Sequence, residues 1–226
     1  MENKIAVVLC GLEKEKKLKE VFSDVKWVEV RIDMFLKIFP EEKLIPYLKK
    51  TRENFHGNII GTVRWFKEQD KEKTYIKETK RREIYEKIIP YVDYLDIEIK
   101  SRLAPKIVKI SKSKNRKTIL SYHNFKKIPS VKKLKSLYQK AELLNPDIFK
   151  LAVQINKTSE FLSLMNLAIK WKQTVLIVPM GMPGIFRFIP LYYGSPFTYV
   201  FLEKPSASGQ FSYETFNSYK KLKDFY

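Results

Sequence analysis

Two side chains in this sequence have the chemistry of a covalent or an acid–base catalyst, and the first is a lysine. Lys150 lies in the stretch DIFKLAV at 147–153, the most apolar setting of any lysine in the chain. Such a setting disfavours the ammonium form, and a neutral amine can attack a ketone to form an iminium that then acts as an electron sink. A lysine that reaches solvent from a strand end, or one paired with a core carboxylate, is the alternative interpretation.

The second candidate is a histidine. His123 ends the stretch TILSYH, and histidine is the side chain best suited to exchange protons near neutral pH. The other histidine, His56, precedes a predicted strand, so we expect it at the opposite end of the fold. Glu68 follows Arg64 by four positions and could orient His123, as a third group orients the base in other relays. A packing histidine and a solvated glutamate are the alternatives.

Eight short apolar, β-branched stretches could position these groups. We predict strands because the stretches are almost continuously apolar, as strands buried on both faces are. Amphipathic patterns at 131–144 and 159–171 predict helices between them, and Thr158 or Ser159 with Glu160 could cap the second. A helix is also expected within 101–115. The predicted strands are 5–10, 27–33, 59–65, 91–97, 118–122, 148–153, 174–180 and 197–202.

The alternation of strands and helices implies right-handed βαβ units and a parallel sheet. Eight such units predict a (β/α)8 TIM barrel, and the lack of a Pro-, Gly- or Ser-rich linker favours one domain over 1–226. Functional groups of such barrels lie at the carboxyl ends of the strands. Polar residues recur there in this chain, which predicts a polar active site: Glu29, Arg31, Arg64, Asp96, Glu98, His123 and Lys150.

The chain is strongly basic, with 44 Lys and Arg against 25 Asp and Glu and a net charge of +19. No acidic residue occurs from 99 to 141. Such a balance raises nucleic acid as a partner, but attraction of an anionic small substrate is the simpler interpretation. The single cysteine, Cys10, allows no intrachain disulfide and favours a reducing cytoplasm. No run of about 18 apolar residues predicts a membrane span.

Two glycine-containing stretches near the end of the chain could bind an anion and cover it. The stretch MGMPGIFR at 180–187 combines a tight turn with Arg187, which could hold a carboxylate with two hydrogen bonds. The stretch PSASGQ at 205–210 follows the last predicted strand and is small and polar. It could fold over a substrate and supply Ser206 and Gln210 as donors.

These residues together resemble the type I 3-dehydroquinate dehydratase family, and the motifs occur in order along almost the whole chain. The lysine follows the histidine by 27 positions, the difference between 150 and 123. The matching motifs are Glu29-x-Arg31-x-Asp33, Thr62-x-Arg64 with Glu68, Asp93-x-x-Asp96-x-Glu98, Ser121-x-His123-x-Phe125, Asp147-x-x-Lys150-x-Ala152, Met180-Gly181 with Gly184 and Arg187, Gly194-Ser195, and Ser206-Ala-x-Gly209-Gln210.

The resemblance implies an enzyme that dehydrates 3-dehydroquinate to 3-dehydroshikimate through a Schiff base on Lys150, with His123 as general base and acid beside Glu68. Arg187 would bind the substrate carboxylate. The remaining implied contacts are Glu29, Arg31 and Arg64 to the hydroxyls and ring, and Ser206 and Gln210 in a lid. The family also implies a homodimer in the cytoplasm, no cofactor or metal, and no nucleic-acid or membrane partner.

The chain departs from the family pattern at Val8, at Phe186, at Ser208, and at Gln69-Asp70, where a glycine pair is usual. Three other interpretations stay open. A class I aldolase-like barrel would share the lysine, a nucleic-acid-binding protein would explain the charge, and a degenerate barrel would bind ligand without turnover.

Overall fold

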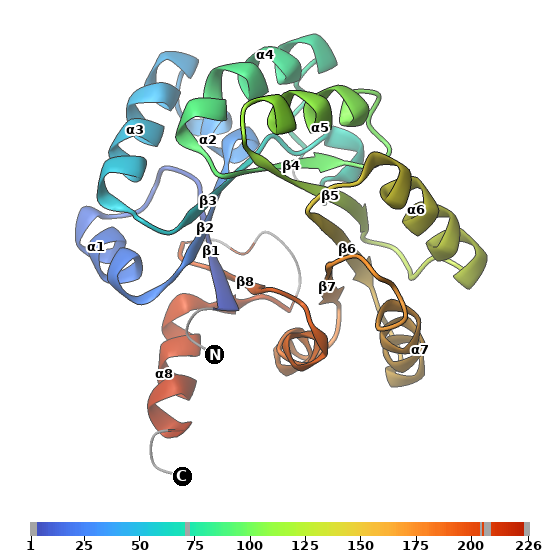
Figure 1. Cartoon of the computed structure of the whole chain (residues 1–226). Coiled ribbons are helices and arrows are strands. Elements are labelled where there is room, and N and C mark those ends of the chain that lie inside the picture. Colours follow the sequence, from blue (N-terminus) through green and yellow to red (C-terminus); the bar gives the residue numbers. More distant parts are fainter. Residues whose placement is uncertain (1–3, 71–72, 204, 206–208, 224–226) are drawn as a thin grey trace.

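Eight parallel strands curl into a barrel, in agreement with the TIM-barrel prediction (Figure 1). The computed structural model describes residues 4–70, 73–203, 205 and 209–223. The hydrogen-bonded order is β7-β6-β5-β4-β3-β2-β1-β8-β9, in which the short β9 (Phe211–Ser212) extends the sheet beside β8. The barrel strands are β1 (Ile5–Leu9), β2 (Trp27–Arg31), β3 (Asn58–Thr62), β4 (Tyr94–Glu98), β5 (Lys117–Asn124), β6 (Ile148–Gln154), β7 (Val175–Met180) and β8 (Thr198–Phe201).

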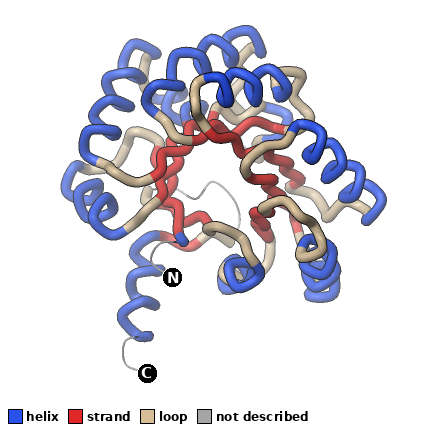
Figure 2. The backbone as a smooth tube through the Cα atoms, in the orientation of Figure 1, coloured by secondary structure: helices blue, strands red, loops and turns tan. Residues whose placement is uncertain are grey.

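Helices surround the strands and connect them (Figure 2). Two helices lie between β2 and β3, and 3-10 turns at Gly184–Arg187 and Ile189–Tyr193 connect β7 to β8. In the part of the chain that the structure describes, no helix has the length and apolar character needed to span a bilayer. The helices are α1 (Glu15–Asp24), α2 (Ile32–Ile38), α3 (Leu44–Asn54), α4 (Glu78–Ile88), α5 (Ala104–Ser113), α6 (Val131–Leu144), α7 (Thr158–Ala168) and α8 (Tyr213–Lys223).

Side chains along each strand alternate between two cores. On β6, Phe149 and Leu151 belong to the outer core between the strands and the helices, while Ile148 and Ala152 belong to the core inside the barrel. Because successive strand residues face opposite sides, Lys150 shares the inward direction of its neighbours at 148 and 152. The strand itself therefore directs this lysine into the barrel.

The inside of the barrel changes from apolar to polar along the strands. At the amino-terminal end, the Trp27 ring packs against Tyr94 and Phe197 with centroid distances of 5.0 and 4.5 Å. The next inward positions carry polar side chains, and the parallel register places them at similar heights. These inward residues are Glu29, Thr62, Asp96, Ser121 and Lys150, followed by Arg31, Glu98 and His123.

The predicted elements are present, with shifted ends. The strand predicted at 118–122 extends to Asn124, and helices occur within 101–115 and at 131–144. The predicted cap of the helix after β6 is wrong by one residue, because Lys157 is the N-cap and Thr158 is already helical. Glu160 satisfies the helix start, since its Oε2 accepts the backbone N–H groups of Asn156 and Lys157 at 2.9 and 3.2 Å.

The turn that leads into β6 gives a first test of the fold. Asn145 caps the end of α6 in the left-handed region, with φ 49° and ψ 60°. We expect Asn145→Ala to lower the free energy of unfolding by about 1 kcal/mol, because alanine lacks the short polar side chain that lets asparagine tolerate the left-handed region. Asn145→Gly should leave it equal or higher, because glycine has no β-carbon to be strained there. Urea denaturation measures both. An equal loss in the two variants would contradict the backbone explanation.

Candidate active site

Lys150 is buried inside the barrel, with 4% of its surface exposed. Its Nζ donates hydrogen bonds to Asp96 Oδ2 at 2.9 Å and to Tyr199 Oη at 3.1 Å, and lies 3.8 Å from Glu29 Oε1. The lysine is thus paired with a core carboxylate, as one sequence interpretation allowed. It also lines a cavity, which a purely structural ion pair does not require.

Arg64 joins the carboxylates of β4 to the neighbouring strand β5. Its Nη1 donates to Asp96 Oδ1 at 2.9 Å, to Glu98 Oε1 at 3.0 Å and to Ser121 Oγ at 2.8 Å. Burial alone would raise the pKa of Asp96, but the Arg64 and Lys150 cations outweigh it and hold that pKa below its ordinary value. Asp96 therefore remains an anion between two cations.

Arg81 extends this charge network from outside the barrel wall. It lies on α4, is fully buried, and donates to Glu98 Oε2, to Glu78 Oε2 at 2.8 Å and to the Val63 carbonyl at 2.7 Å. A buried carboxylate costs several kcal/mol unless it is paired. The two arginines, Arg64 inside and Arg81 behind, together hold Glu98 in place.

His123 and Glu68 form a pair at the carboxyl end of β5. Glu68 Oε2 accepts the backbone N–H of His123 at 2.8 Å and lies 3.2 Å from its Nδ1. Burial, together with the Arg64 and Lys150 cations, lowers the pKa of His123 well below its ordinary value of 6.5. Burial and the Glu98 charge raise the pKa of Glu68 to about 8. Near neutral pH the histidine is a neutral base and Glu68 is mainly protonated.

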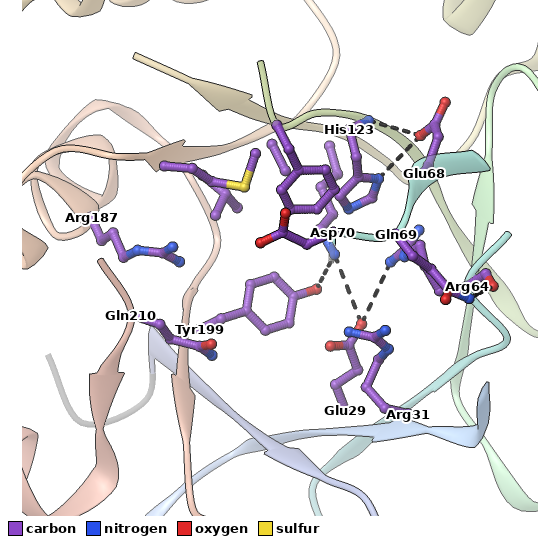
Figure 3. A pocket seen from close by; sticks show the side chains of 15 residues that line it. Glu29, Arg31, Arg64, Glu68, Gln69, Asp70, His123, Arg187, Tyr199 and Gln210 are labelled. Atoms are coloured by element: carbon purple, nitrogen blue, oxygen red, sulfur yellow. Dashed lines mark hydrogen bonds and ion pairs between the residues drawn. The ribbon is translucent and has the colours of Figure 1, made fainter. Parts of the chain in front are cut away.

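The loop after β3 is held by Gln69, at the departure from the family's glycine pair. Gln69 Nε2 donates to the Arg64 carbonyl at 2.7 Å, and its Oε1 accepts the Thr74 backbone N–H at 2.5 Å. The glutamine side chain thus closes the loop that carries Glu68. Asp70 lies beside it and lines the same cavity (Figure 3).

The opposite side of the cavity carries Arg187 and Gln210, as Figure 3 shows. Arg187 is 2% exposed, and burial lowers its pKa to about 10. Nearer to Glu29, Arg31 is held by Asp33 through two hydrogen bonds, of 3.0 and 2.7 Å. Arginines on two sides of one cavity suit an anionic ligand.

Every residue that the sequence analysis gave a catalytic or substrate-binding role, except Ser206, lines this one cavity, which is partly open to solvent. Ser206, like Ser208, lies outside the described residues. Within the described chain, no group of three or more His, Cys, Asp or Glu could hold a metal ion. The predicted residues in the cavity are Glu29, Arg31, Arg64, Glu68, His123, Lys150, Arg187 and Gln210.

Sequence reasoning did not assign site roles to four residues that contact the predicted ones. Asp96 and Glu98 were predicted as members of the polar site without individual roles, and their contacts with Lys150 and Arg64 were not foreseen. Ser121 was named only as part of the motif around His123, and Tyr199 was not singled out. The inward parity of their strands was the available signal, since Tyr199 has the same parity as Phe197, which packs inside the barrel.

This fold and cavity define a β/α-barrel protein with a polar site at the carboxyl ends of its strands. The family model described as Type I 3-dehydroquinase matches residues 5–224. The chain belongs to the type I 3-dehydroquinase family.

Curated relatives agree with that assignment over most of their length. A 3-dehydroquinate dehydratase of Thermodesulfovibrio yellowstonii is 32% identical over 91% of this chain and 89% of that protein. One from Methanocaldococcus jannaschii is 31% identical over 97% and 98%. Among solved structures, the 3-dehydroquinate dehydratase of Aquifex aeolicus aligns with a TM-score of 0.80 and 29% identity, covering 97% of this chain and 98% of that one.

The raised pKa of Glu68 predicts how stability depends on pH. Between about pH 4.5 and pH 8 the unfolded chain ionises Glu68 while the folded protein keeps it protonated. The contribution of Glu68 to the free energy of unfolding should therefore fall as pH rises through this window, by at most about 1.4 kcal/mol per pH unit. Below about pH 6.5 the lowered pKa of His123 acts in the opposite direction, so the Glu68 contribution is measured as the difference between the wild type and Glu68→Gln. In Glu68→Gln this contribution is absent. Urea denaturation of both proteins at each end of the pH window measures the difference in their free energies of unfolding.

The exposed Glu83→Gln on α4 is the matched control, and its stability should follow the wild type at both pH values. A Glu68→Gln variant whose stability relative to the wild type does not change with pH would show that Glu68 is already ionised in the folded protein at low pH.

Proposed function

We propose that this protein dehydrates 3-dehydroquinate to 3-dehydroshikimate through an imine, a Schiff base, between the substrate ketone and Lys150. Membership of the 3-dehydroquinase family supports the substrate. The observation that carries the mechanism is that a buried amine and the His123–Glu68 pair line the same cavity. Neighbouring register positions bring them together, since Ser121 pairs with Lys150 and His123 with Ala152.

In the proposed sequence, the Lys150 ammonium first loses a proton to solvent, and the neutral amine attacks the ketone. Uptake of a proton and loss of water then give an iminium. The positive nitrogen draws electrons from the adjacent carbon, so His123 removes a proton there as general base. The resulting enamine expels the hydroxyl group one carbon further on, and His123 returns its proton to that hydroxyl as water leaves. Hydrolysis of the imine then releases the product and restores the amine.

The other cavity residues would bind the substrate. Arg187, buried on the side of the cavity opposite Glu68, suits the substrate carboxylate, and Gln210 beside it suits a lid contact. Glu29, Arg31 and Arg64 would hold hydroxyls and the ring. A single catalytic domain over 1–226, a homodimer and a cytoplasmic location stay predictions, as does the role of Ser206.

Nucleic-acid binding is less well supported. Single-stranded nucleic acid is bound by basic grooves with exposed aromatic rings on which bases stack. In the acid-free stretch 99–141, Tyr122 and Tyr138 are buried, and Phe125 lines the cavity. The lysines there lie mainly on the outer faces of α5 and α6, where they can attract small anions without a stacking surface.

Borohydride trapping tests the proposal directly. The protein mixed with 3-dehydroquinate and sodium borohydride should gain a stable adduct on Lys150, located by peptide mass spectrometry. Lys150→Gln should give no adduct and lose at least about 1,000-fold in kcat. Lys135→Gln, which changes an exposed lysine on α6, should behave as the wild type. A folded wild-type protein that dehydrates the substrate without forming the adduct would refute the imine mechanism.

Changing His123 should separate imine formation from proton transfer. We expect His123→Ala to lose about 100- to 10,000-fold in kcat while Lys150 still forms a trappable adduct. In the wild type, kcat/KM should hold its plateau down to pH values well below 6.5, because the pKa of His123 is lowered and the base stays neutral there. A decrease centred at or above pH 6.5 would show that this shift, or the assignment of the base, is wrong.

A further inference from the structure

Tyr199 contacts Lys150 inside the barrel. It lies on β8, is 5% exposed, and its hydroxyl is 3.1 Å from Lys150 Nζ. Its ring crosses the middle of the cavity between Arg187 and Glu29 (Figure 3). The Lys150 nitrogen also lies 4.3 Å from the centre of the ring, a distance at which the ring face attracts a cation.

The contacts of Lys150 define how its nitrogen is oriented. Lys150 attacks as the neutral amine, after its ammonium form has lost a proton. A neutral amine has two N–H bonds and one lone pair, and the structure supplies two acceptors, Asp96 Oδ2 and Tyr199 Oη. When both N–H bonds are used in this way, the lone pair takes the remaining tetrahedral position. Asp96 is ionised and accepts only, whereas the Tyr199 hydroxyl also carries a hydrogen that it can donate.

Attack on a ketone separates two charges, and a hydroxyl group in this position can neutralise both by transferring protons. As the C–N bond forms, the carbonyl electron pair moves to oxygen, which leaves a positive nitrogen and a negative oxygen on the same carbon. Direct transfer of a proton between them would pass through a strained four-membered ring. A hydroxyl that accepts from the nitrogen and donates to the oxygen closes a six-membered ring instead.

We propose that Tyr199 is a further catalytic residue of this enzyme, and that it relays a proton from the Lys150 nitrogen to the oxygen of the addition intermediate. The tyrosine gives its hydroxyl hydrogen to the oxygen and receives one from the nitrogen. The products are a neutral carbinolamine and an unchanged tyrosine, so no charge or proton is left over. This inference rests on the imine mechanism proposed above.

The surroundings of the hydroxyl fit a relay better than a base. Burial, and then the negative charges of Glu29 and Asp96, raise the pKa of Tyr199 well above its ordinary value of 10. A free phenolate is therefore unfavourable, and the hydroxyl keeps its hydrogen in the resting protein. A relay that receives a proton as it gives one never forms that phenolate.

The test compares Tyr199→Phe with Tyr94→Phe, because each removes one hydroxyl from a tyrosine whose ring packs in the barrel interior and keeps that ring. Tyr94 packs against Trp27 at the amino-terminal end, away from the cavity. Each variant is mixed with 3-dehydroquinate, quenched with borohydride at successive times, and weighed as intact protein. We expect Tyr199→Phe to form the adduct at least roughly 100-fold more slowly than the wild type, and Tyr94→Phe to match the wild type.

Two different outcomes separate an error about the Tyr199 relay from an error about the Lys150 imine. If the wild type forms no adduct, the imine proposal itself is wrong. If the wild type forms it and Tyr199→Phe forms it within twofold of the same rate, the imine stands and the relay is wrong.

A second measurement does not depend on the variant folding. The rate of adduct formation by the wild type should fall along a curve as the fraction of D2O in the solvent increases. Such a curve is expected when two protons move in the same step, here one from the nitrogen and one from the tyrosine. A straight-line dependence, which requires one proton, would overturn the relay.

Discussion

The ion-pair chain Lys150–Asp96–Arg64–Glu98–Arg81 runs from β6 inside the barrel to α4 outside it. Its charges alternate in sign, and its members are buried. Water cannot solvate charges at such depth, so each is retained only because its neighbours have the opposite sign. The rest of the site depends on this chain, since it orients the lysine, fixes the arginine beside the histidine, and ties the segment just after β3 to the strands β4 and β6.

Strand geometry explains how residues far apart in the sequence enter this chain, and it made much of the site predictable. Eight apolar stretches predicted a parallel barrel, and polar residues at their carboxyl ends had to meet at one end of it. Glu29, Arg64, His123 and Lys150 do line one cavity for that reason. The alternation of side chains adds the direction in which each one points, as Ile148 and Ala152 show for Lys150.

The contacts between elements could not be predicted in the same way. Arg81 lies in a helix whose mixed charges predict exposure to solvent. Only the packing of α4 on the barrel brings this arginine to Glu98. Tyr199 lies in an apolar strand where an aromatic residue is expected for packing alone. Gln69 stands where the family usually has a glycine. The hydrogen bonds by which it closes the loop depend on the positions of the Arg64 and Thr74 backbone groups. Sequence spacing carries no information on distances of this kind.

One electrostatic arrangement suits both the resting protein and the proposed intermediate. An ammonium and an iminium at Lys150 carry the same positive charge at the same place, so Asp96, held ionised by Arg64 and Lys150, can neutralise either without rearrangement. The same two cations lower the pKa of His123 and keep it a neutral base. A cationic electron sink and a neutral histidine are both needed when the proton is removed. Because one set of charges favours both, loss of Arg64 would change the electrostatic environment of the lysine and of the histidine together.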